Sequence, residues 1–381
     1  MTSKTHSVEV EITEFTARFL WRGLRPFVAS HLSKRCNRCI LSERYVTLDD
    51  EGVCSECRAW EAGEAERGAG GAADAAGDRA RLDALLHDAA GPGQYDALVL
   101  VSGGKDSAYM LHRLQTEYPS LRILTMLVNN GFMSPFALEN ADRLLKHFDV
   151  PHITLKLKPE MAQTGFRYVL THLDKQTAYS IVDLMDACFT FDSAMQMAAR
   201  LQIPCVICGL AKVQTEYVYG PITVELTPAQ YKAPLVDQLG VGFDAIFNAA
   251  QMPFWYEAPA GPDAVAPRFV LPFTVWDPSE DEVLREVERL GLLTRRRSRP
   301  LVTNNALIPV IGMAEVARFG YCSWEIEFAR MVREGKSERP YWLNMFEMLE
   351  YSTRTGKFVN KTVDETLAAL GLAKRDIGIG T

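Results

Sequence analysis

The sequence predicts an α/β protein in which helices sandwich a parallel sheet, preceded by a cysteine-rich module and followed by a helical C-terminal region. Over residues 97–209, short apolar runs rich in β-branched residues alternate with segments that have apolar residues at helical spacing. This alternation requires right-handed crossovers, and therefore parallel strands covered on both faces. Two Cys-x-x-Cys pairs precede that region, and mainly helical patterns follow it.

Composition narrows the class of protein. The chain has 381 residues and a net charge of −7, which gives no general support for nucleic-acid binding. No apolar run approaches transmembrane length, and the N-terminus lacks the apolar core of a signal peptide. Eight cysteines without an export signal indicate metal or redox chemistry in a reducing compartment. We therefore expect a soluble cytoplasmic enzyme.

The first 35 residues carry apolar side chains interleaved with arginines. The apolar residues are Phe15, Phe19, Leu20, Trp21, Leu24, Phe27 and Val28, with Arg18, Arg22 and Arg25 between them. A basic amphipathic segment can touch a membrane, but packing on its own domain or on a second subunit is the preferred interpretation. Gly23 and Pro26 argue against one long helix.

Four cysteines form two knuckles, and they are Cys36, Cys39, Cys54 and Cys57. Each knuckle offers two thiolates from one tight turn, and tetrahedral Zn²⁺ takes four such ligands. The residues between the knuckles, 40–48, have the β-branched and aromatic character of a small hairpin. The sequence therefore predicts a zinc-ribbon-like module whose closed site stabilises the fold and does not activate water.

The segment after the cysteines is predicted to connect this module to the sheet. Residues 58–78 are rich in Ala, Gly and Glu, which is typical of a flexible connector. A helix is predicted over 79–90, because three leucines share one face and Gly91-Pro92 would stop it.

The most informative stretch of the sequence is Ser102-Gly103-Gly104-Lys105-Asp106-Ser107. It follows a predicted buried strand, 97–101, and opens a predicted helix. The two glycines can take positive φ and let backbone N–H groups approach an anion closely. The helix N-terminus favours negative charge at the same point, and the lysine and serines add further donors. Together these features predict a phosphate-binding loop.

Three more strands are predicted over 122–129, 152–157 and 204–209, with helices over 135–148 and 187–201. Ligands of parallel sheets bind at the carboxyl ends of the strands. That rule brings the loops 102–107, 129–131 and 209–216 to one rim of the sheet.

The last of these loops contains Gly209, Lys212, Gln214 and Glu216. Lys212 could neutralise phosphate, and Gln214 or Glu216 could hold Mg²⁺ through water or contact a substrate. The alternative is that Gln214 and Glu216 merely begin the next helix.

A third Cys-x-x-Cys pair, Cys205 and Cys208, lies inside an apolar strand. Side chains of a strand point in differing directions, so we expect buried core thiols there and no shared metal.

Residues 217–270 are rich in proline, and an aromatic cluster is formed by Phe247, Phe254, Trp255 and Tyr256. We expect this cluster in a substrate-covering insertion or in a subunit contact. The basic run 295–299 is expected to be solvated surface, with nucleic-acid contact as the less favoured alternative.

The hexapeptide 102–107 resembles the Ser-Gly-Gly-x-Asp-Ser motif of the PP-loop ATP pyrophosphatases. The resemblance implies a HUP/Rossmann-like fold, ATP and Mg²⁺ as ligands, and cleavage of ATP between its α- and β-phosphates. It also implies phosphate contacts from the hexapeptide, catalytic roles for Lys105 and Asp106, and an adenine and ribose platform at Val128 and Asn129.

The order of motifs is similar to that of the N-acetyl sugar amidotransferase branch of this family. The shared features are the cysteine knuckles, the hexapeptide, Gly-x-x-x-x-Gln-x-Glu over 209–216, and Phe319-Gly-Tyr321. The resemblance implies adenylation of the amide oxygen of an N-acetyl sugar, followed by displacement of AMP by ammonia from a partner glutaminase.

Sulfur-transferring PP-loop enzymes also resemble the chain, and this alternative stays open. Cys188 and Cys322 would then be sulfur carriers, with help from Cys205 and Cys208, and a sulfur-donor protein would replace the glutaminase. Thr303-Asn304-Asn305 stands where such relatives would have a cysteine, and no activating group surrounds Cys188. Nitrogen transfer is therefore preferred, a small molecule is favoured over tRNA as substrate, and a homodimer is expected.

The predicted organisation has five parts. They are an N-terminal segment over 1–35, a zinc-binding module over 36–60, a linker and helix over 61–94, a PP-loop ATP-binding domain over 95–275 and a helical region over 276–381.

Overall fold

The computed structural model of the chain describes residues 4–67, 71–89, 91–174, 179–221, 224–257, 266–293, 301 and 305–380. Its centre is a six-stranded sheet with the order β3-β2-β1-β4-β6-β5. The strands are β1 (Ala97–Leu100), β2 (Ile123–Asn129), β3 (His152–Lys156), β4 (Cys205–Ile207), β5 (Glu225–Leu226) and β6 (Arg268–Val270). Neighbouring strands are parallel except β5, which is antiparallel to β6. The predicted parallel sheet is confirmed.

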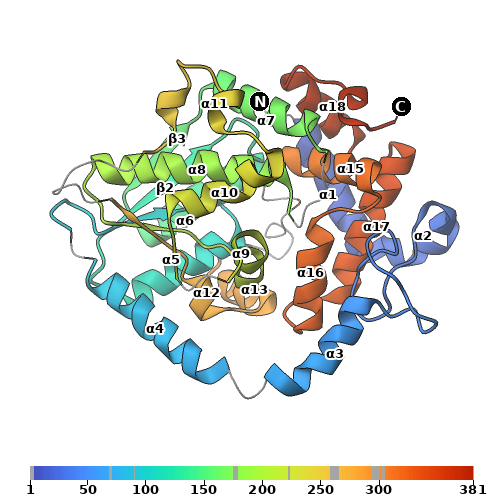
Figure 1. The fold of residues 1–381 in the computed structure, drawn as a ribbon, viewed down its shortest axis with the longest axis horizontal. Helices are drawn as coiled ribbons and strands as arrows, with labels where there is room; N and C mark the ends of the chain where they lie inside the picture. Colours follow the sequence, from blue (N-terminus) through green and yellow to red (C-terminus); the bar gives the residue numbers. More distant parts are fainter. Residues whose placement is uncertain are drawn as a thin grey trace.

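Helices cover both faces of this sheet. The helices of the sheet half are α4 (Gly71–His87), α5 (Lys105–Glu117), α6 (Pro135–Phe148), α7 (Pro159–Thr171), α8 (Ile181–Arg200), α9 (Lys212–Tyr219), α10 (Pro228–Leu239), α11 (Phe243–Ile246), α12 (Phe273–Trp276) and α13 (Glu280–Arg289), with the 3₁₀ turn η3 (Met252–Phe254). Ala97 and Val99 of β1 pack toward α4, α5, α6 and α13, whereas Leu98 and Leu100 pack toward α8 and α10 (Figure 1). This alternation is the strand period expected of a sheet buried on both faces.

The strand order places a topological switch point between β1 and β4. The chain runs from β1 outward to β2 and β3, and then returns to the other side of β1 with β4 and β6. Two crossovers therefore leave in opposite directions at this point, and ligands of open α/β sheets bind in the crevice that results. The loops after β1 and β4 lie at this crevice.

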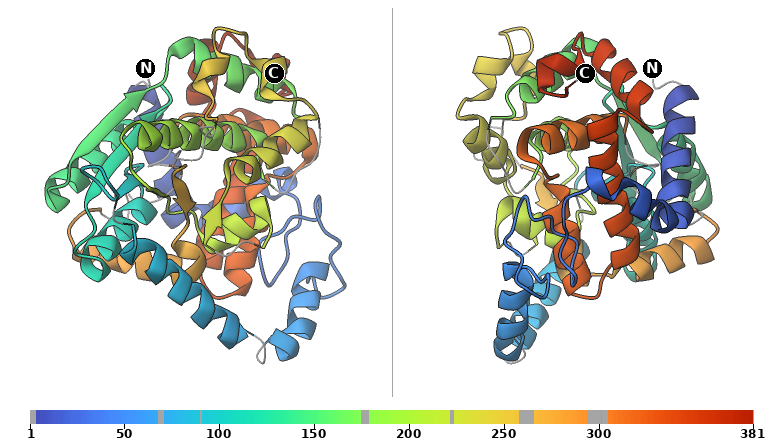
Figure 2. Two further views of the ribbon diagram at one scale, coloured as in Figure 1. Left: turned by 60° about the vertical axis from the view of Figure 1, so that its left-hand side comes forward. Right: turned by 90° about the vertical axis from the view of Figure 1, so that its right-hand side faces the viewer.

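A second, all-helical half lies beside the sheet, and Figures 1 and 2 show it in orange and red. Its helices are α15 (Leu307–Phe319), α16 (Trp324–Arg333), α17 (Arg339–Thr355) and α18 (Asn360–Ala369), followed by the 3₁₀ turn η5 (Lys374–Ile377). The prediction of a helical C-terminal region is confirmed. A shared hydrophobic core joins α7 and α8 of the sheet half to α15 and α18.

The N-terminal segment packs on this helical half. It contains α1 (Lys4–Phe15), the π-helical turn η1 (Thr16–Leu20), α2 (Trp21–Val28) and the 3₁₀ turn η2 (Ala29–His31). Trp21 is 1% exposed, and its Nε1–H donates to Glu347 of α17 at 2.8 Å. The segment is not one long helix, as predicted, but the interruption falls at η1, and Gly23 and Pro26 lie within α2.

The structure corrects the prediction of a flexible connector over 58–78. Most of these residues lie in α3 (Ser55–Arg67) and α4, which form the long arc below the sheet in Figure 1. Alanine has the highest helix propensity, and an Ala-rich run therefore favours helix despite its glycines. Leu82 and Leu86 fix the second half of α4 to the sheet.

The predicted hairpin over 40–48 is also corrected. Isolated antiparallel bridges join Arg35 to Ser42 and Leu48 to Cys54. The first bridge flanks the first knuckle, and the second closes the turn that leads into the second knuckle. The aromatic cluster forms neither a lid over the sheet nor an exposed contact. Phe247 and Trp255 are buried and pack on Phe189 of α8. This packing removes the large apolar surface of the rings from water.

No helix of the described residues combines the length and the apolarity that crossing a membrane requires. The basic run 295–299, and Thr303 and Asn304, lie outside the described residues.

Candidate active site

The glycine loop is built by close packing between β1 and two helices. Gly103 has φ +77, and a Cβ at this position would lie 1.9 Å from the carbonyl oxygen of Ala137 on α6. Any larger residue would be both strained and in collision. Gly104 is the N-cap of α5, so the loop leads directly into the first-turn amides of that helix.

Both serines of the hexapeptide hold the loop closed. The Ser107 hydroxyl donates to the Gly104 carbonyl at 3.1 Å and accepts from the Ser102 backbone at 3.3 Å. The Ser102 hydroxyl accepts from the Gly104 backbone at 3.3 Å. Lys105 Nζ lies 2.8 Å from a carboxylate oxygen of Asp106, and the Lys105 side chain is 11% exposed. The loop therefore presents a positive helix end with an adjacent ammonium group, which suits a phosphate.

The loop opens into a cavity of about 270 Å³. Residues from the β1 and β4 loops line it, namely Lys105, Asp106, Gly209, Lys212 and Gln214. These residues are about a hundred positions apart in sequence, and the pairing of β1 with β4 brings them together. Lys212 is the first residue of α9 and has no hydrogen-bond or ion-pair partner among the described residues. Two helix N-termini and two lysines thus meet at the switch point.

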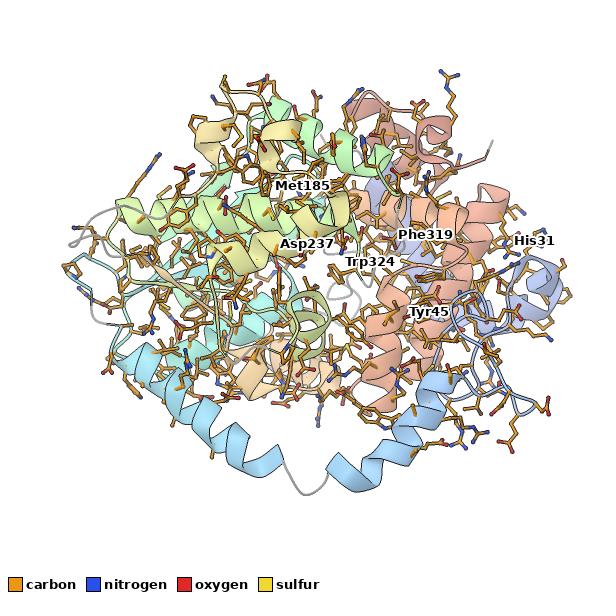
Figure 3. The ribbon with its side chains drawn as sticks, viewed as in Figure 1. His31, Tyr45, Met185, Asp237, Phe319 and Trp324 are labelled. Carbon is orange, nitrogen blue, oxygen red and sulfur yellow. The ribbon has the colours of Figure 1, made fainter. Side chains whose placement is uncertain are left out.

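The opposite wall of the cavity comes from α8, α16 and Tyr179, which lies two residues before α8. Trp324, Glu327, Phe328 and Met331 of α16 line the cavity at helical spacing, together with Tyr179 and Asp183. The indole Nε1–H of Trp324 donates to Asp183 at 2.7 Å, and Gln214 donates to the hydroxyl of Tyr179. Figure 3 places Trp324 in the middle of the molecule, between the sheet and the C-terminal helices. We call these residues the helical wall.

Burial changes the charge of the helical wall. Desolvation raises the pKa of Glu327 to about 8, although the nearby Lys105 acts in the opposite direction. Desolvation also raises the pKa of Asp183 well above its usual range, and the hydrogen bond from Trp324 offsets only part of this. Glu327 therefore keeps its proton near neutral pH, and the raised pKa of Asp183 makes it lose its proton less readily than a free aspartate. Together with the phenol of Tyr179 and the indole of Trp324, these groups suit an uncharged, hydroxyl-bearing ligand.

Seven of the residues predicted for nucleotide or metal binding are absent from the cavity lining: Ser102, Gly103, Gly104 and Ser107 of the loop, and Val128, Asn129 and Glu216. Val128 and Asn129 end β2, and the Asn129 side chain accepts from the Gly131 backbone at 2.9 Å. Glu216 forms an ion pair with Arg330 of α16 at 2.5 Å. The pair joins α9 to α16, so Glu216 links the two sides of the cavity from outside it.

Cys188 lies in the hydrophobic core. It is 0% exposed, its thiol is 4.0 Å from the Tyr231 carbonyl oxygen, and burial raises its pKa. Cys205 and Cys322 are also buried, and burial raises the pKa of the partly buried Cys208 to about 12. None of these four thiols is the exposed, low-pKa group that sulfur transfer requires.

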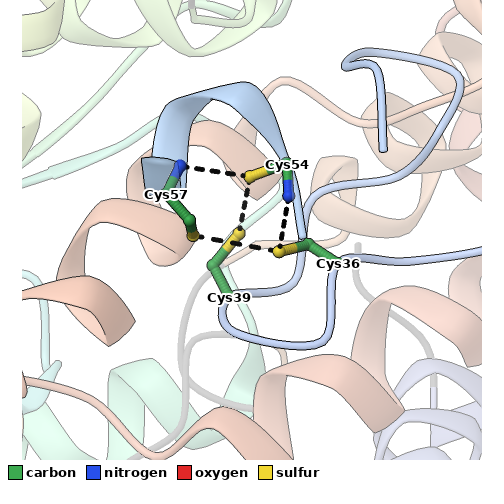
Figure 4. A group of neighbouring side chains, drawn as sticks. All are labelled: Cys36, Cys39, Cys54 and Cys57. Carbon is green, nitrogen blue, oxygen red and sulfur yellow. Dashed lines mark hydrogen bonds between the residues drawn. The ribbon is translucent and has the colours of Figure 1, made fainter. Parts of the chain in front are cut away.

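The four cysteines of the N-terminal knuckles meet in a buried cluster (Figure 4). Their sulfur atoms all lie within 4.8 Å of one another, with Cys36 to Cys57 at 3.8 Å and Cys39 to Cys54 at 3.7 Å. Backbone N–H groups of Cys54 and Cys57 donate to sulfur at 3.3 and 3.4 Å, which favours the thiolate form. The cluster can hold one metal ion.

Residues 35–57, which carry the four cysteines and are called the metal module below, pack on the side of α16 that faces away from the cavity. Ile326 and Ala329, on the side of α16 away from the cavity, pack with the four cysteines. Arg35 reaches from the module to Glu325 at 2.7 Å, and Arg339 donates to the carbonyls of Cys36 and Cys39. Gly320 ends α15 with φ +82, which turns Tyr321 onto Tyr45 of the module. The Phe-Gly-Tyr motif thus belongs to this contact.

Sequence reasoning missed the helical wall. The available signal was the pair Asp183 and Asp186, one turn apart on an otherwise apolar helix. Carboxyl groups on such a face need a partner or a cavity. Asp186 does find a partner, because the Asn130 amide donates to it at 2.8 Å.

Comparisons with known proteins give distant similarity only. No protein-family model matches the chain, and no curated protein matches it. Among solved structures, U34-tRNA thiolase NcsA from Methanococcus maripaludis with its [4Fe-4S] cluster is 14% identical, with a TM-score of 0.37, and the match covers 92% of this chain and 99% of that chain.

Two synthetases give shorter matches. NMN synthetase from Francisella tularensis is 16% identical over 48% of this chain and 76% of that chain, with a TM-score of 0.28. NH3-dependent NAD synthetase from Campylobacter jejuni is 15% identical over 44% of this chain and 74% of that chain, also with a TM-score of 0.28. TM-scores this low do not establish a shared fold, so function has to be argued from the site itself.

Proposed function

We propose that the chain is a PP-loop ATP pyrophosphatase that adenylates a substrate amide and then transfers nitrogen to it. The observation that carries this proposal is the glycine loop at the switch point, because its packing admits only glycine at position 103 and the two residues after the glycines, Lys105 and Asp106, line the cavity. Lys105 and Lys212 would bind the phosphates of ATP, and the amides that begin α5 would add donors. Asp106 and Gln214 would hold Mg²⁺, which offsets the charge of the leaving pyrophosphate.

The proposed reaction has two steps. The amide oxygen attacks the α-phosphorus, the bond to the bridging oxygen of the β-phosphate breaks, and pyrophosphate leaves. Ammonia then attacks the former carbonyl carbon, its surplus proton is lost, and the oxygen departs with AMP. The lysines of the loop stabilise the charge that grows on pyrophosphate in the first step.

An N-acetyl sugar is the substrate class that fits the helical wall. Trp324 offers an apolar face for a sugar ring, and Asp183, Tyr179 and Glu327 offer hydrogen bonds to hydroxyl groups. The raised pKa values of Asp183 and Glu327 lower the negative charge that would otherwise repel ATP next to the sugar. Burial is the main cause of both shifts.

Nitrogen transfer is favoured over sulfur transfer by the positions of the cysteines. Seven of the eight cysteines are buried and the eighth, Cys208, is only partly exposed. A persulfide carrier must reach both its donor and its substrate. The ammonia would come from a partner glutaminase in the cytoplasm, where the buried thiols stay reduced.

Zn²⁺ is the metal that fits the cysteine cluster. A tetrahedral ion with Zn–S bonds of about 2.3 Å holds its sulfurs about 3.8 Å apart. Two of the sulfur pairs lie at 3.8 and 3.7 Å, and all four sulfurs lie within 4.8 Å of one another, so a single ion fits with little adjustment. In a [4Fe–4S] cluster each thiolate binds a different iron, which spreads the sulfurs further apart. One zinc per chain without acid-labile sulfide is therefore expected on metal analysis.

The test is a coupled assay for AMP and pyrophosphate with N-acetyl sugars, using ammonium or sulfide as donor, followed by mass spectrometry of the product. Replacement of oxygen by NH lowers the product mass by about one unit, whereas replacement by sulfur raises it by about sixteen. A product one unit lighter that forms with ammonium supports the proposal. A product sixteen units heavier would replace it with sulfur transfer.

A further inference from the structure

The outer side of the N-terminal helices is unusually apolar. Seven of the ten large apolar side chains that are exposed in the described part of the chain lie between residues 8 and 27. They are Val8, Ile12, Phe15, Phe19, Leu20, Leu24 and Phe27. Phe19 is 64% exposed and Phe27 is 85% exposed. We call this set the apolar ridge.

The apolar ridge cannot be buried by a simple rotation of its helices, because their inner side is firmly held. Val10, Ala17 and Trp21 are 0–1% exposed. Arg25 forms an ion pair with Glu347 of α17 at 2.6 Å, and the Asn344 amide donates to the Ala17 carbonyl at 2.7 Å. The ridge is therefore a fixed surface of the folded chain.

The size of the apolar ridge fits a protein interface. Three of the seven residues are phenylalanines, which cover about 150–250 Å² each, and the other four are smaller aliphatic residues. At the observed exposures the ridge presents roughly 700 Å² of apolar surface. A monomer rarely exposes more than a few hundred Å² in one patch. A stable interface takes about 800 Å² from each partner.

Charge along the segment identifies the partner. Glu11 lies at the start of the ridge, and Arg18 and Arg22 lie in its second half. The Glu9 carboxylate faces the molecule, because it accepts from the backbone of Lys361 and Thr362. A second copy related by a twofold axis runs antiparallel, and it sets the acidic half of one ridge against the basic half of the other. An anionic membrane surface would attract only the arginines and repel Glu11.

We infer that the apolar ridge is the interface of a homodimer in which two N-terminal segments pair antiparallel about a twofold axis. The inference goes beyond the proposed function and does not depend on it. The interface would lie close to the active site, because Thr13, on the inner side of α1, lines the cavity. Dimerisation would hold α1 in place over that cavity.

The first test is the mass of the full chain by sedimentation velocity across a dilution series up to about 50 µM. The wild type is expected to be a dimer, and Phe19→Asp is expected to weaken the dimer about a hundredfold, because the change occurs twice in each interface. Leu138→Asp, at an exposed leucine of α6, is the matched control and should leave the dimer intact. A monomeric wild type would overturn the inference, as would a Phe19→Asp dimer as tight as the wild type.

A charge exchange tests the antiparallel arrangement. Glu11→Arg and Arg22→Glu should each weaken the dimer about tenfold, and the double variant should recover most of the loss because each changed residue again faces the opposite charge. Equal, additive losses in the double variant would contradict the arrangement.

Flotation with vesicles of anionic lipid tests whether the ridge binds a membrane. A monomer that binds these vesicles through Phe19 would show a membrane surface in place of a dimer interface.

Discussion

The two sides of the cavity are made in different ways. The loop side consists of consecutive residues, 102–107, at the end of one strand, together with the loop after the neighbouring strand β4. The helical wall consists of side chains from α8 and α16, about 140 positions apart in sequence. The loop side depends on local backbone geometry, whereas the wall depends on how one half of the molecule packs on the other. The difference implies that the loop side acts on the nucleotide and the wall acts on the second substrate.

The largest effect is expected from the loop side. Lys105→Ala should lower AMP formation about a thousandfold, because the ammonium group that stabilises the departing pyrophosphate is lost. Its carboxylate partner Asp106 is partly exposed, so the unfolding temperature should hardly change. Steady-state AMP release and thermal unfolding check both points, with the exposed Lys146→Ala as control. Unchanged AMP release in Lys105→Ala would remove the loop from the mechanism.

A second substitution distinguishes two reasons why the loop needs glycine, namely its close packing and its positive φ. Gly103→Ala should lower AMP formation about a hundredfold and destabilise the fold by about 2–4 kcal/mol, because the new Cβ would meet the Ala137 carbonyl oxygen. Gly240→Ala is the matched control: its φ is +70 in the left-handed region, but no atom lies within 4 Å of the place that the added methyl group would take. Denaturant titration should therefore show only the cost of positive φ in the control, about 1–2 kcal/mol. Equal losses at both positions would show that close packing of the loop is unimportant.

The helical wall should respond differently. Asp183→Ala should raise KM for the acceptor substrate about tenfold while KM for ATP changes less than about twofold, because it removes the hydrogen bond that orients Trp324. Asp186→Ala, one turn along the same helix and outside the cavity lining, is the control. If Asp183→Ala raised both KM values equally, the claim that the loop side acts on ATP and the helical wall acts on the acceptor substrate would be wrong.

The smallest expected effect is a pH dependence of stability. The folded Glu327 carboxyl keeps its proton up to about pH 8, whereas its usual pKa is 4.5. Between these values the folded state binds one proton more than the unfolded state, so stability falls as the pH rises. Glu327→Gln should therefore match the wild type near pH 5 and unfold a few degrees higher near pH 8.5.

Thermal unfolding at both pH values checks this, with exposed Glu288→Gln as control. A constant difference between Glu327→Gln and the wild type at all pH values would show that Glu327 does not hold a proton in the wall.

The sequence was sufficient for features that local residues determine. Strands β1 to β4, the glycine loop and the cysteine knuckles were predicted because each depends on neighbouring residues, whereas the short strands β5 and β6 of the proline-rich segment were not. The spacing Cys-x-x-Cys shows the limit of such patterns. At 36–39 and 54–57 it sits in turns that bring four sulfurs together, whereas at 205–208 it runs through β4 and yields two separate core thiols.

The remaining features depend on packing between distant segments. Nothing in the spacing of Asp183 or Glu327 indicates that α8 and α16 face each other, because α15 and the metal module set the position of α16. The prediction of a flexible connector over 58–78 was wrong for another reason. A segment rich in alanine and glycine can form either a linker or a helix, and here the helix propensity of alanine decided the outcome.

The central claim is that the glycine loop presents the α-phosphorus of ATP to an amide oxygen. The most direct measurement is turnover of an acceptor labelled with oxygen-18 in its acetyl carbonyl, with mass analysis of the nucleotide product. The account predicts AMP that carries the label in its phosphate, together with one pyrophosphate per product. ADP with orthophosphate, or AMP without the label, would contradict it.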